Sequence, residues 1–341
     1  MTASSPASIE LQQRIDEYLH GAGLSDRGPS PTAVTGDASD RRYVRVRFRD
    51  GTSIMLAVHV GPIEFASLPF ANVWGLLREI PLPVPNILGH SDRLGIIALE
   101  DLGDLTLQEH LRNADMAQRT ALYREAITFI ERLQRRGDAL ASNKYVPYGV
   151  AFDVEKLTWE LNYFLRHFVE GFRGVRLEPS ERLALAEEFA TLASGLAAEP
   201  RVVCHRDYHS RNLMLHDGRL FVIDFQDARM GPDTYDLVSL LHDAYVEITS
   251  EEREAHIDRV VAGMGSADPH AFRRRFNVMT VQRTLKALGT FGYQATVRHN
   301  PVYLQYVPRT AGYARDAMAN DERFARLRGI LGRHVPELRC S

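Results

Sequence analysis

The sequence contains few cysteines and few lysines, and it has no concentrated run of one charge. Its 341 residues include two cysteines, Cys204 and Cys340, and only three of its 41 lysine and arginine residues are lysines. Two cysteines without a Cys-x-x-Cys pair exclude a disulfide framework and a zinc site built on such pairs. The net charge is −3, and there is no basic tract. We therefore expect no nucleic-acid partner, because duplex binding needs concentrated positive charge.

The chain also lacks long apolar segments. No uncharged window approaches the ~18 apolar residues that a membrane helix needs, so we expect no membrane association. The N-terminal residues MTASSPASIELQQ have no cationic segment followed by an apolar one, and thus do not resemble a secretion signal. These absences predict a cytoplasmic protein with reduced thiols. They do not indicate its oligomeric state.

The first hundred residues carry the patterns of a small antiparallel sheet. Residues 43–49 alternate between apolar and arginine side chains, which predicts a strand with its apolar side chains inward and its arginines in water. The apolar set is Val44, Val46 and Phe48, and the arginines are Arg45, Arg47 and Arg49. Asp50-Gly51 then predicts a hairpin turn into a more buried strand at residues 52–60.

Other segments complete a two-lobed picture. Residues 9–24 are typical of a short amphipathic helix, 28–32 of a turn, 65–80 of a helix, 81–90 of a rigid connector and 94–102 of a buried strand. From residue 106 onward most patterns are helical. We therefore predict an α+β protein, with a small antiparallel-sheet lobe over residues 1–103 and a large, mainly helical lobe over residues 104–341.

One β-rich segment of the second lobe carries the chemistry. His205-Arg206-Asp207 is followed by Asn212, and a hairpin centred on Asp217-Gly218 would bring Asn212 beside Asp224. An amide and a carboxylate oxygen suit Mg²⁺, and Asp207 could accept the proton of a substrate hydroxyl. This is the division of labour that phosphoryl transfer requires. The alternative is that these residues only cap turns, as Asp and Asn often do.

The segment VVCHRDYHSRNLM, followed by FVIDFQDARMGPDTYDLVSLLHDAY, resembles the aminoglycoside phosphotransferase superfamily, which includes choline and fructosamine kinases. GDASDRRY, LEDLGDLTL, IDFQDA, GPDTYDLVSLL and QRTLKALGTFG are most similar to bacterial N-acetylmuramate/N-acetylglucosamine anomeric kinases. The resemblance implies a bilobal, protein-kinase-like fold. It also implies ATP-dependent phosphorylation of the anomeric hydroxyl of an amino sugar, with Mg²⁺ as cofactor, in cell-wall recycling.

The resemblance also assigns roles to single residues. Asp207 is expected to be the base, Asn212 and Asp224 the Mg²⁺ ligands, and Asp236 a buttress of the catalytic loop. His205 is expected to brace Asp207 rather than to form a zinc site with His209 and His216, because this stretch is loop and hairpin. The residues expected to contact the sugar are Glu160, Gln226 and Asp227.

The nucleotide side departs from the usual kinase pattern. There is no P-loop motif, and no lysine precedes Lys144, so the usual strand lysine is absent. Gly36 occupies the position of a phosphate-covering turn. Arg41 and Arg42, with His59 as a further candidate, could replace the lysine, since arginine fits phosphate well. By resemblance, the backbones of Glu100 and Leu102 would contact adenine.

The helical lobe offers one further candidate region. Trp159, Tyr163, Phe164 and Phe168 recur at helical spacing, which predicts that they are mostly core. Glu160, on the opposite face, could reach a sugar hydroxyl, although an isolated glutamate is more often solvated.

Three other functions remain open from the sequence. An aminoglycoside or choline kinase would need an acidic pocket, and no acidic cluster is evident. The missing lysine fits a nucleotide-binding pseudokinase, although Asp207, Asn212 and Asp224 are all present. A metal-dependent hydrolase would need a second cluster of metal ligands.

Overall fold

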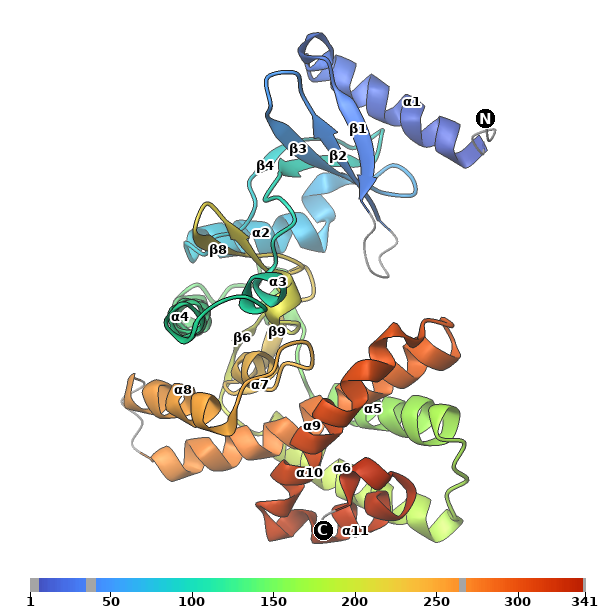
Figure 1. The fold of residues 1–341 in the computed structure, drawn as a ribbon, viewed down its shortest axis with the longest axis vertical. Coiled ribbons are helices and arrows are strands. Elements are labelled where there is room, and N and C mark those ends of the chain that lie inside the picture. Colours follow the sequence, from blue (N-terminus) through green and yellow to red (C-terminus); the bar gives the residue numbers. More distant parts are fainter. Residues whose placement is uncertain (1–5, 35–40, 264–267, 340–341) are drawn as a thin grey trace.

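The computed structural model describes residues 6–34, 41–263 and 268–339, with side chains from residue 9 onward. A small lobe with one antiparallel sheet stands on a larger helical lobe (Figure 1). The predicted α+β, two-lobed architecture is confirmed. No described helix has the length and apolar character needed to cross a membrane.

The sheet of the small lobe has the order β1-β2-β3-β5-β4, with every neighbouring pair antiparallel. Its strands are β1 (Ser30–Val34), β2 (Arg42–Arg47), β3 (Ser53–Val58), β4 (Ile87–Ser91) and β5 (Ile96–Glu100). The predicted turn at Asp50-Gly51 joins β2 to β3, and Gly51 adopts a φ of 84° that suits glycine. One face packs on α1 (Pro6–Gly21) through Ile15 and Leu19, and α2 (Pro69–Glu79) belongs to the core on the other side.

The two edge strands correct the sequence prediction. Residues 28–32 were expected to form only a turn, but Ser30–Val34 form β1 at one edge of the sheet. Residues 81–90 were expected to form a connector, but Ile87–Ser91 form β4 at the other edge. An edge strand tolerates Pro31 because a missing N–H that faces away from the neighbouring strand removes no ladder hydrogen bond.

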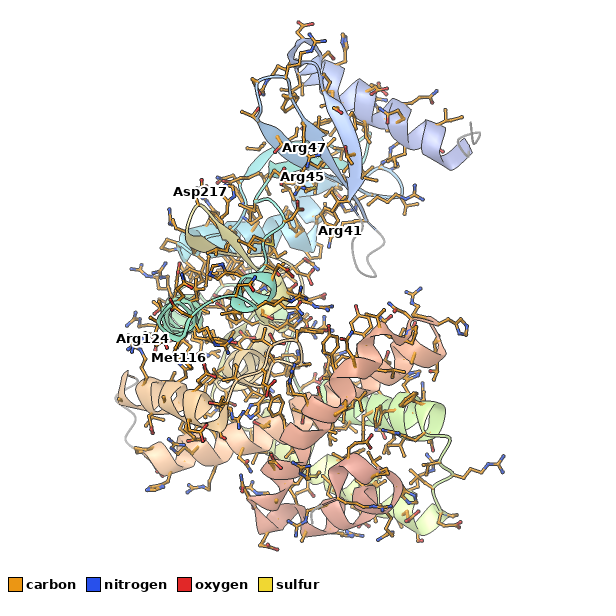
Figure 2. All side chains as sticks on the ribbon, in the orientation of Figure 1. Arg41, Arg45, Arg47, Met116, Arg124 and Asp217 are labelled. Carbon is orange, nitrogen blue, oxygen red and sulfur yellow. The ribbon has the colours of Figure 1, made fainter. Side chains whose placement is uncertain are left out.

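Arg45 is a second correction. It was expected in water, yet its residue is only 6% exposed. Its guanidinium donates to Asp101 at 2.7 and 2.9 Å and to Asp104 at 2.8 Å, so that it ties β2 to the linker between the lobes. Arg47 is exposed, as predicted. Figure 2 shows both arginines on β2, with Arg41 nearer to the helical lobe.

The large lobe consists of helices around two short β-ladders, β6–β9 and β7–β8. The ladders are formed by β6 (Arg201–Cys204), β7 (Leu213–His216), β8 (Arg219–Val222) and β9 (Arg229–Pro232). Its helices are α3 (Leu107–Leu111), α4 (Met116–Ala139), α5 (Val154–Phe164), α6 (Pro179–Ala197), α7 (Tyr235–Leu241), α8 (Ser250–Gly263), α9 (Pro269–Thr296), α10 (Val307–Ala319) and α11 (Ala325–His334). The hairpin predicted around Asp217-Gly218 is the β7–β8 ladder.

Two glycines let α9 pack closely on α5 and on the π-helical continuation of α5, Leu165–Phe172. A Cβ on Gly289 would lie 2.8 Å from the Cα of Phe164. A Cβ on Gly292 would lie 2.8 Å from the Cα of Phe168 and still closer to the carbonyl oxygen of His167. These are backbone atoms, which cannot turn aside as a side chain can. The position of α9, which carries part of the site described below, therefore depends on both glycines.

We expect Gly292→Ala to destabilise the protein by about 1–3 kcal/mol, because the added methyl forces two helices apart. Thermal and urea unfolding would measure the change. Gly195→Ala in α6 is the matched control, since a Cβ there meets nothing within 4 Å. In that helix, alanine is expected to stabilise by about 0.5–1 kcal/mol. Equal stability of the two variants would contradict the packing argument.

Candidate active site

A cleft of about 1030 Å³ opens between the two lobes. Tyr43, Met55 and Leu99 line it from the sheet, and the linker Glu100–Asp104 lines it from the side. The loop around Asp207, together with α5, α7 and α9, forms the opposite wall. Clefts between lobes with a few converging polar groups are the usual sites of small ligands.

The loop His205-Arg206-Asp207 directly follows β6 and is held by buried contacts. The Asp236 carboxylate on α7 accepts hydrogen bonds from the backbone amides of His205 (2.6 Å) and Arg206 (3.0 Å). The Nε2 atom of His205 lies 2.9 Å from the carbonyl oxygen of Ile223. Arg206 adopts a left-handed φ of 85°, which a non-glycine residue keeps only when its surroundings hold it. His205 and Asp236 thus lie where bracing residues are expected.

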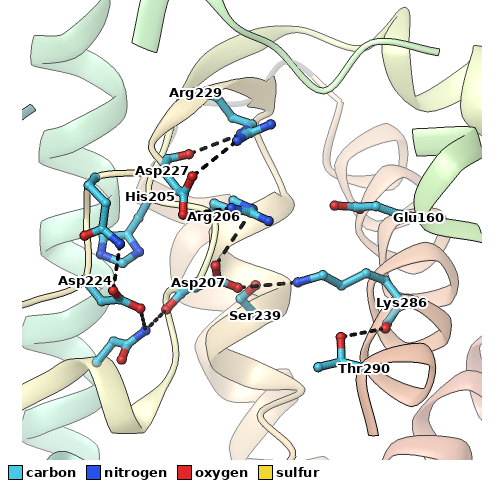
Figure 3. A network of polar contacts seen from close by, with 12 residues as sticks. Glu160, His205, Arg206, Asp207, Asp224, Asp227, Arg229, Ser239, Lys286 and Thr290 are labelled. Atoms are coloured by element: carbon cyan, nitrogen blue, oxygen red, sulfur yellow. Dashed lines mark hydrogen bonds and ion pairs between the residues drawn. The ribbon is translucent and has the colours of Figure 1, made fainter. Parts of the chain in front are cut away.

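Asp207 faces three cations. Its carboxylate lies 3.4 Å from Lys286 Nζ, 3.7 Å from Arg283 Nη2 and 3.8 Å from Arg206 Nε. Burial alone would raise the pKa of Asp207, but Lys286, Arg206 and Arg283 outweigh it and hold this pKa well below its usual range. Asp207 is therefore a carboxylate, the form that accepts a proton (Figure 3).

Asn212 and Asp224 lie side by side, as the hairpin predicts. The Asn212 amide nitrogen donates to the backbone oxygen of Asp207 at 2.9 Å and lies 3.4 Å from Asp224 Oδ2. Asp224 has a left-handed φ of 61° and accepts a hydrogen bond from Gln226 at 2.9 Å. One amide oxygen and one carboxylate are hard ligands that fit Mg²⁺, which keeps several waters. Among the described residues, no group of three or more His, Cys, Asp or Glu side chains could hold a metal ion.

Glu160 is buried rather than solvated. Only 1% of the residue is exposed, and it lines the cleft. Its Oε2 accepts a hydrogen bond from Gln282 on α9 at 2.9 Å, whereas its Oε1 is buried without a partner among the described residues. Asp227, which also lines the cleft, pairs with Arg206 at 3.0 Å. Glu160 is therefore not a solvated surface residue, because α9 covers the face of α5 that carries it.

The residues that could replace the missing strand lysine differ in whether they line the cleft. Arg41 lines the cleft with its guanidinium over the Phe70 ring, 5.7 Å from the ring centroid. Arg42 is exposed at the start of β2, and neither Arg42 nor His59 belongs to the described lining of the cleft. Gly36 lies outside the described residues.

The linker places both adenine candidates at the cleft. Glu100 and Leu102 line it, and Leu102 is only 6% exposed. The Glu100 carboxylate is occupied by Asn86, which donates from its backbone and its side chain at 3.0 and 2.7 Å. The side chain of Glu100 is therefore engaged within the small lobe, and its backbone amide also donates to the carbonyl oxygen of Asn86 at 2.9 Å.

Sequence reasoning missed Arg283 and Lys286, which α9 places against Asp207. The rarity of lysine was a signal that could have pointed to Lys286. The prediction for the aromatic residues holds for Phe164 and Phe168, which are fully buried. It is wrong for Trp159, which is 53% exposed and stacks on Tyr163 at the cleft.

Comparison with known proteins gives matches over both lobes. The model of the phosphotransferase enzyme family matches residues 32–271. An N-acetylmuramate/N-acetylglucosamine kinase of Neisseria meningitidis is 34% identical over 317 residues, covering 90% of this chain and 91% of that protein. A protein of the same name from Pseudomonas aeruginosa is 34% identical over 331 residues, covering 94% of each.

Solved structures share the fold at low sequence identity. A choline/ethanolamine kinase family protein from Mesorhizobium loti has a TM-score of 0.59 at 17% identity, covering 93% of this chain and 99% of that one. An ADP-bound aminoglycoside phosphotransferase has a TM-score of 0.57 at 13% identity, covering 86% of this chain and 96% of that one. The kinase-like form of the fold is thereby confirmed. Since the family model spans most of the chain and relatives above 30% identity span nearly all of it, the chain belongs to the phosphotransferase enzyme family.

Proposed function

We propose that this protein transfers the γ-phosphoryl group of ATP to the anomeric hydroxyl of N-acetylmuramate, N-acetylglucosamine or both. The observation that carries the proposal is the 34% identity to two N-acetylmuramate/N-acetylglucosamine kinases along more than 90% of their length. The product would be a sugar 1-phosphate in cell-wall recycling. Because the phosphoryl donor is ATP, we place the reaction in the cytoplasm.

The geometry of the cleft supports a division of roles. Asp207, ionised and facing the cleft, accepts the proton of the sugar hydroxyl. Asn212 and Asp224 would hold Mg²⁺, which neutralises charge on the phosphates when bound. Asp236 and His205 keep the loop in place.

The remaining contacts divide between the two substrates. The linker backbone at Glu100 and Leu102 receives adenine, and Arg41 rather than Arg42 reaches the phosphates. On the sugar side, the buried Oε1 of Glu160 is left to accept a hydrogen bond from the substrate. The structure adds no direct support for Gln226 and Asp227 as sugar contacts, since Gln226 donates to Asp224 and Asp227 pairs with Arg206. We place the boundary between the lobes after residue 103.

Asp207→Asn is expected to lower kcat by about 10²–10⁴, because an amide cannot accept the proton. Mg·ADP affinity should stay near the wild-type value, since a base acts in the transition state. Coupled ADP-release kinetics and calorimetry would measure the two quantities. Asp26→Asn, on the exposed surface of the small lobe, is the control. Near-normal turnover of Asp207→Asn would remove Asp207 from the mechanism.

Asp224→Ala is expected to abolish the Mg²⁺ dependence of nucleotide binding and most turnover, because the metal loses its carboxylate ligand. Titration of ADP with and without Mg²⁺ isolates this effect from the chemical step. An unchanged gain in ADP affinity on adding Mg²⁺ would show that Asp224 is not a ligand.

The position of phosphorylation can be tested with paired substrates. The anomeric hydroxyl is more acidic than the ring alcohols, so a carboxylate removes its proton more readily. We expect turnover with the free amino sugar and none with its 1-O-methyl glycoside, with phosphorus NMR identifying the product. Phosphorylation of the glycoside would contradict the anomeric assignment alone. Activity only on an aminoglycoside or choline would overturn the proposed substrate.

A further inference from the structure

Two cations project from adjacent turns of α9 toward the catalytic base. Arg283 and Lys286 are three residues apart, which puts them on one face of the helix. Their side chains are only 11% and 15% exposed. Figure 3 shows the Lys286 side chain reaching from α9 to Asp207. Both cations help to keep Asp207 ionised, but the proposed roles of Asp207, Asn212 and Asp224 give neither of them a ligand of its own.

The carboxylates of the site provide no close ion-pair partner for Arg283 or Lys286. Asp207 is the one acidic side chain in ion-pair distance of either residue within the described ranges, at 3.4 Å from Lys286 and 3.7 Å from Arg283. Strong charge-assisted hydrogen bonds are about 2.7–2.9 Å long, so both contacts are loose. Arg206, the third cation at Asp207, has a closer partner in Asp227 at 3.0 Å.

The donors of Arg283 are also largely unused. Its Nε donates to Ser239 on α7 at 2.8 Å, which fixes the plane of the guanidinium. Its two terminal nitrogens donate no hydrogen bond to any described residue, and both Arg283 and Lys286 line the cleft. The terminal nitrogens of Arg283 and the ammonium of Lys286 therefore keep donor capacity on the cleft side that a ligand can use. A planar guanidinium group beside an ammonium group can donate several hydrogen bonds to the oxygens of an oxyanion.

We propose that Arg283 and Lys286 form an oxyanion-binding site next to Asp207. Both cations lie 3.4–3.7 Å from the Asp207 carboxylate, so a ligand held by them lies beside the acceptor hydroxyl. Under the proposed function, on which this inference rests, two oxyanions come there. One is the phosphoryl group in transfer, and the other is the carboxylate that N-acetylmuramate has and N-acetylglucosamine lacks.

The first arm of the test uses inorganic phosphate without nucleotide. Thermal shift and calorimetry would compare the wild type with Arg283→Met and Lys286→Met, with sodium chloride at matched ionic strength as reference. Arg274→Met and Lys144→Met are the controls, because these cations are 60% and 64% exposed and lie away from Asp207. We expect phosphate to stabilise the wild type and both controls but neither cleft variant. This arm stays informative even when no sugar is phosphorylated, so it separates the site from the proposed function.

The second arm compares the two amino sugars. If the site holds the phosphoryl group, the kcat of each cleft variant should fall by a factor of about 10²–10³ with both sugars. This is the usual effect of removing one preorganised hydrogen-bond donor from an active site. If it holds the sugar carboxylate, KM should rise at least about tenfold, or ~1.4 kcal/mol, for N-acetylmuramate alone. Either result supports an oxyanion site and identifies its ligand.

A purely structural role gives a different pattern. Melting temperature and Mg·ADP affinity would then fall together, and Lys286→Arg would be no better than Lys286→Met. The oxyanion site predicts that Lys286→Arg regains at least about tenfold in the impaired parameter, since it keeps a cation there. Absence of phosphate binding by the wild type, or unaltered kinetics of both cleft variants with both sugars, would overturn the proposal.

Discussion

The geometry of the site depends first on hydrogen bonds from backbone amides of the Asp207 loop to two buried carboxyl groups. Asp236 accepts from the amides of His205 and Arg206, and Asp243, just after α7, accepts from the amide of Ser210 at 2.8 Å. The two anchors hold the loop on both sides of Asp207. They make up for the strained backbone of Arg206, because these buried hydrogen bonds outweigh the cost of a left-handed φ. The orientation of Asp207 is thus set by α7 and the residues just after it, outside the loop that carries Asp207.

Residues of the site that are close in sequence could be predicted, because a tight hairpin has one plausible register. Asn212 and Asp224 are twelve residues apart, and the Asp217-Gly218 turn alone brings them together. The same reasoning gave the β2–β3 hairpin and the α+β fold. Placing these two side chains together needed no knowledge of how the lobes pack.

The sequence could not show what depends on tertiary packing. Alternation correctly put Arg45 on the face opposite Val44, but only the fold shows that Asp101 and Asp104 cover that face. Glu160 is buried because α9 crosses α5 at Gly289 and the π-helical continuation of α5 at Gly292, a contact between segments more than a hundred residues apart. Periodicity tells which residues share a face, and not what covers it.

The absence of a lysine before Lys144 means that the positive charge of the cleft comes from other residues. A kinase of the usual pattern takes its lysine from the small lobe, where it pairs with the phosphates. Here Arg41 supplies a cation from that side, while Arg283 and Lys286 supply two from a helix of the large lobe. The charges on α9 and Asp207 belong to the same lobe, so the distance between them does not depend on where the small lobe lies. Under the proposed function, positive charge on the acceptor side is therefore supplied by the large lobe alone, and this preorganisation depends on the glycine contacts that hold α9 in place.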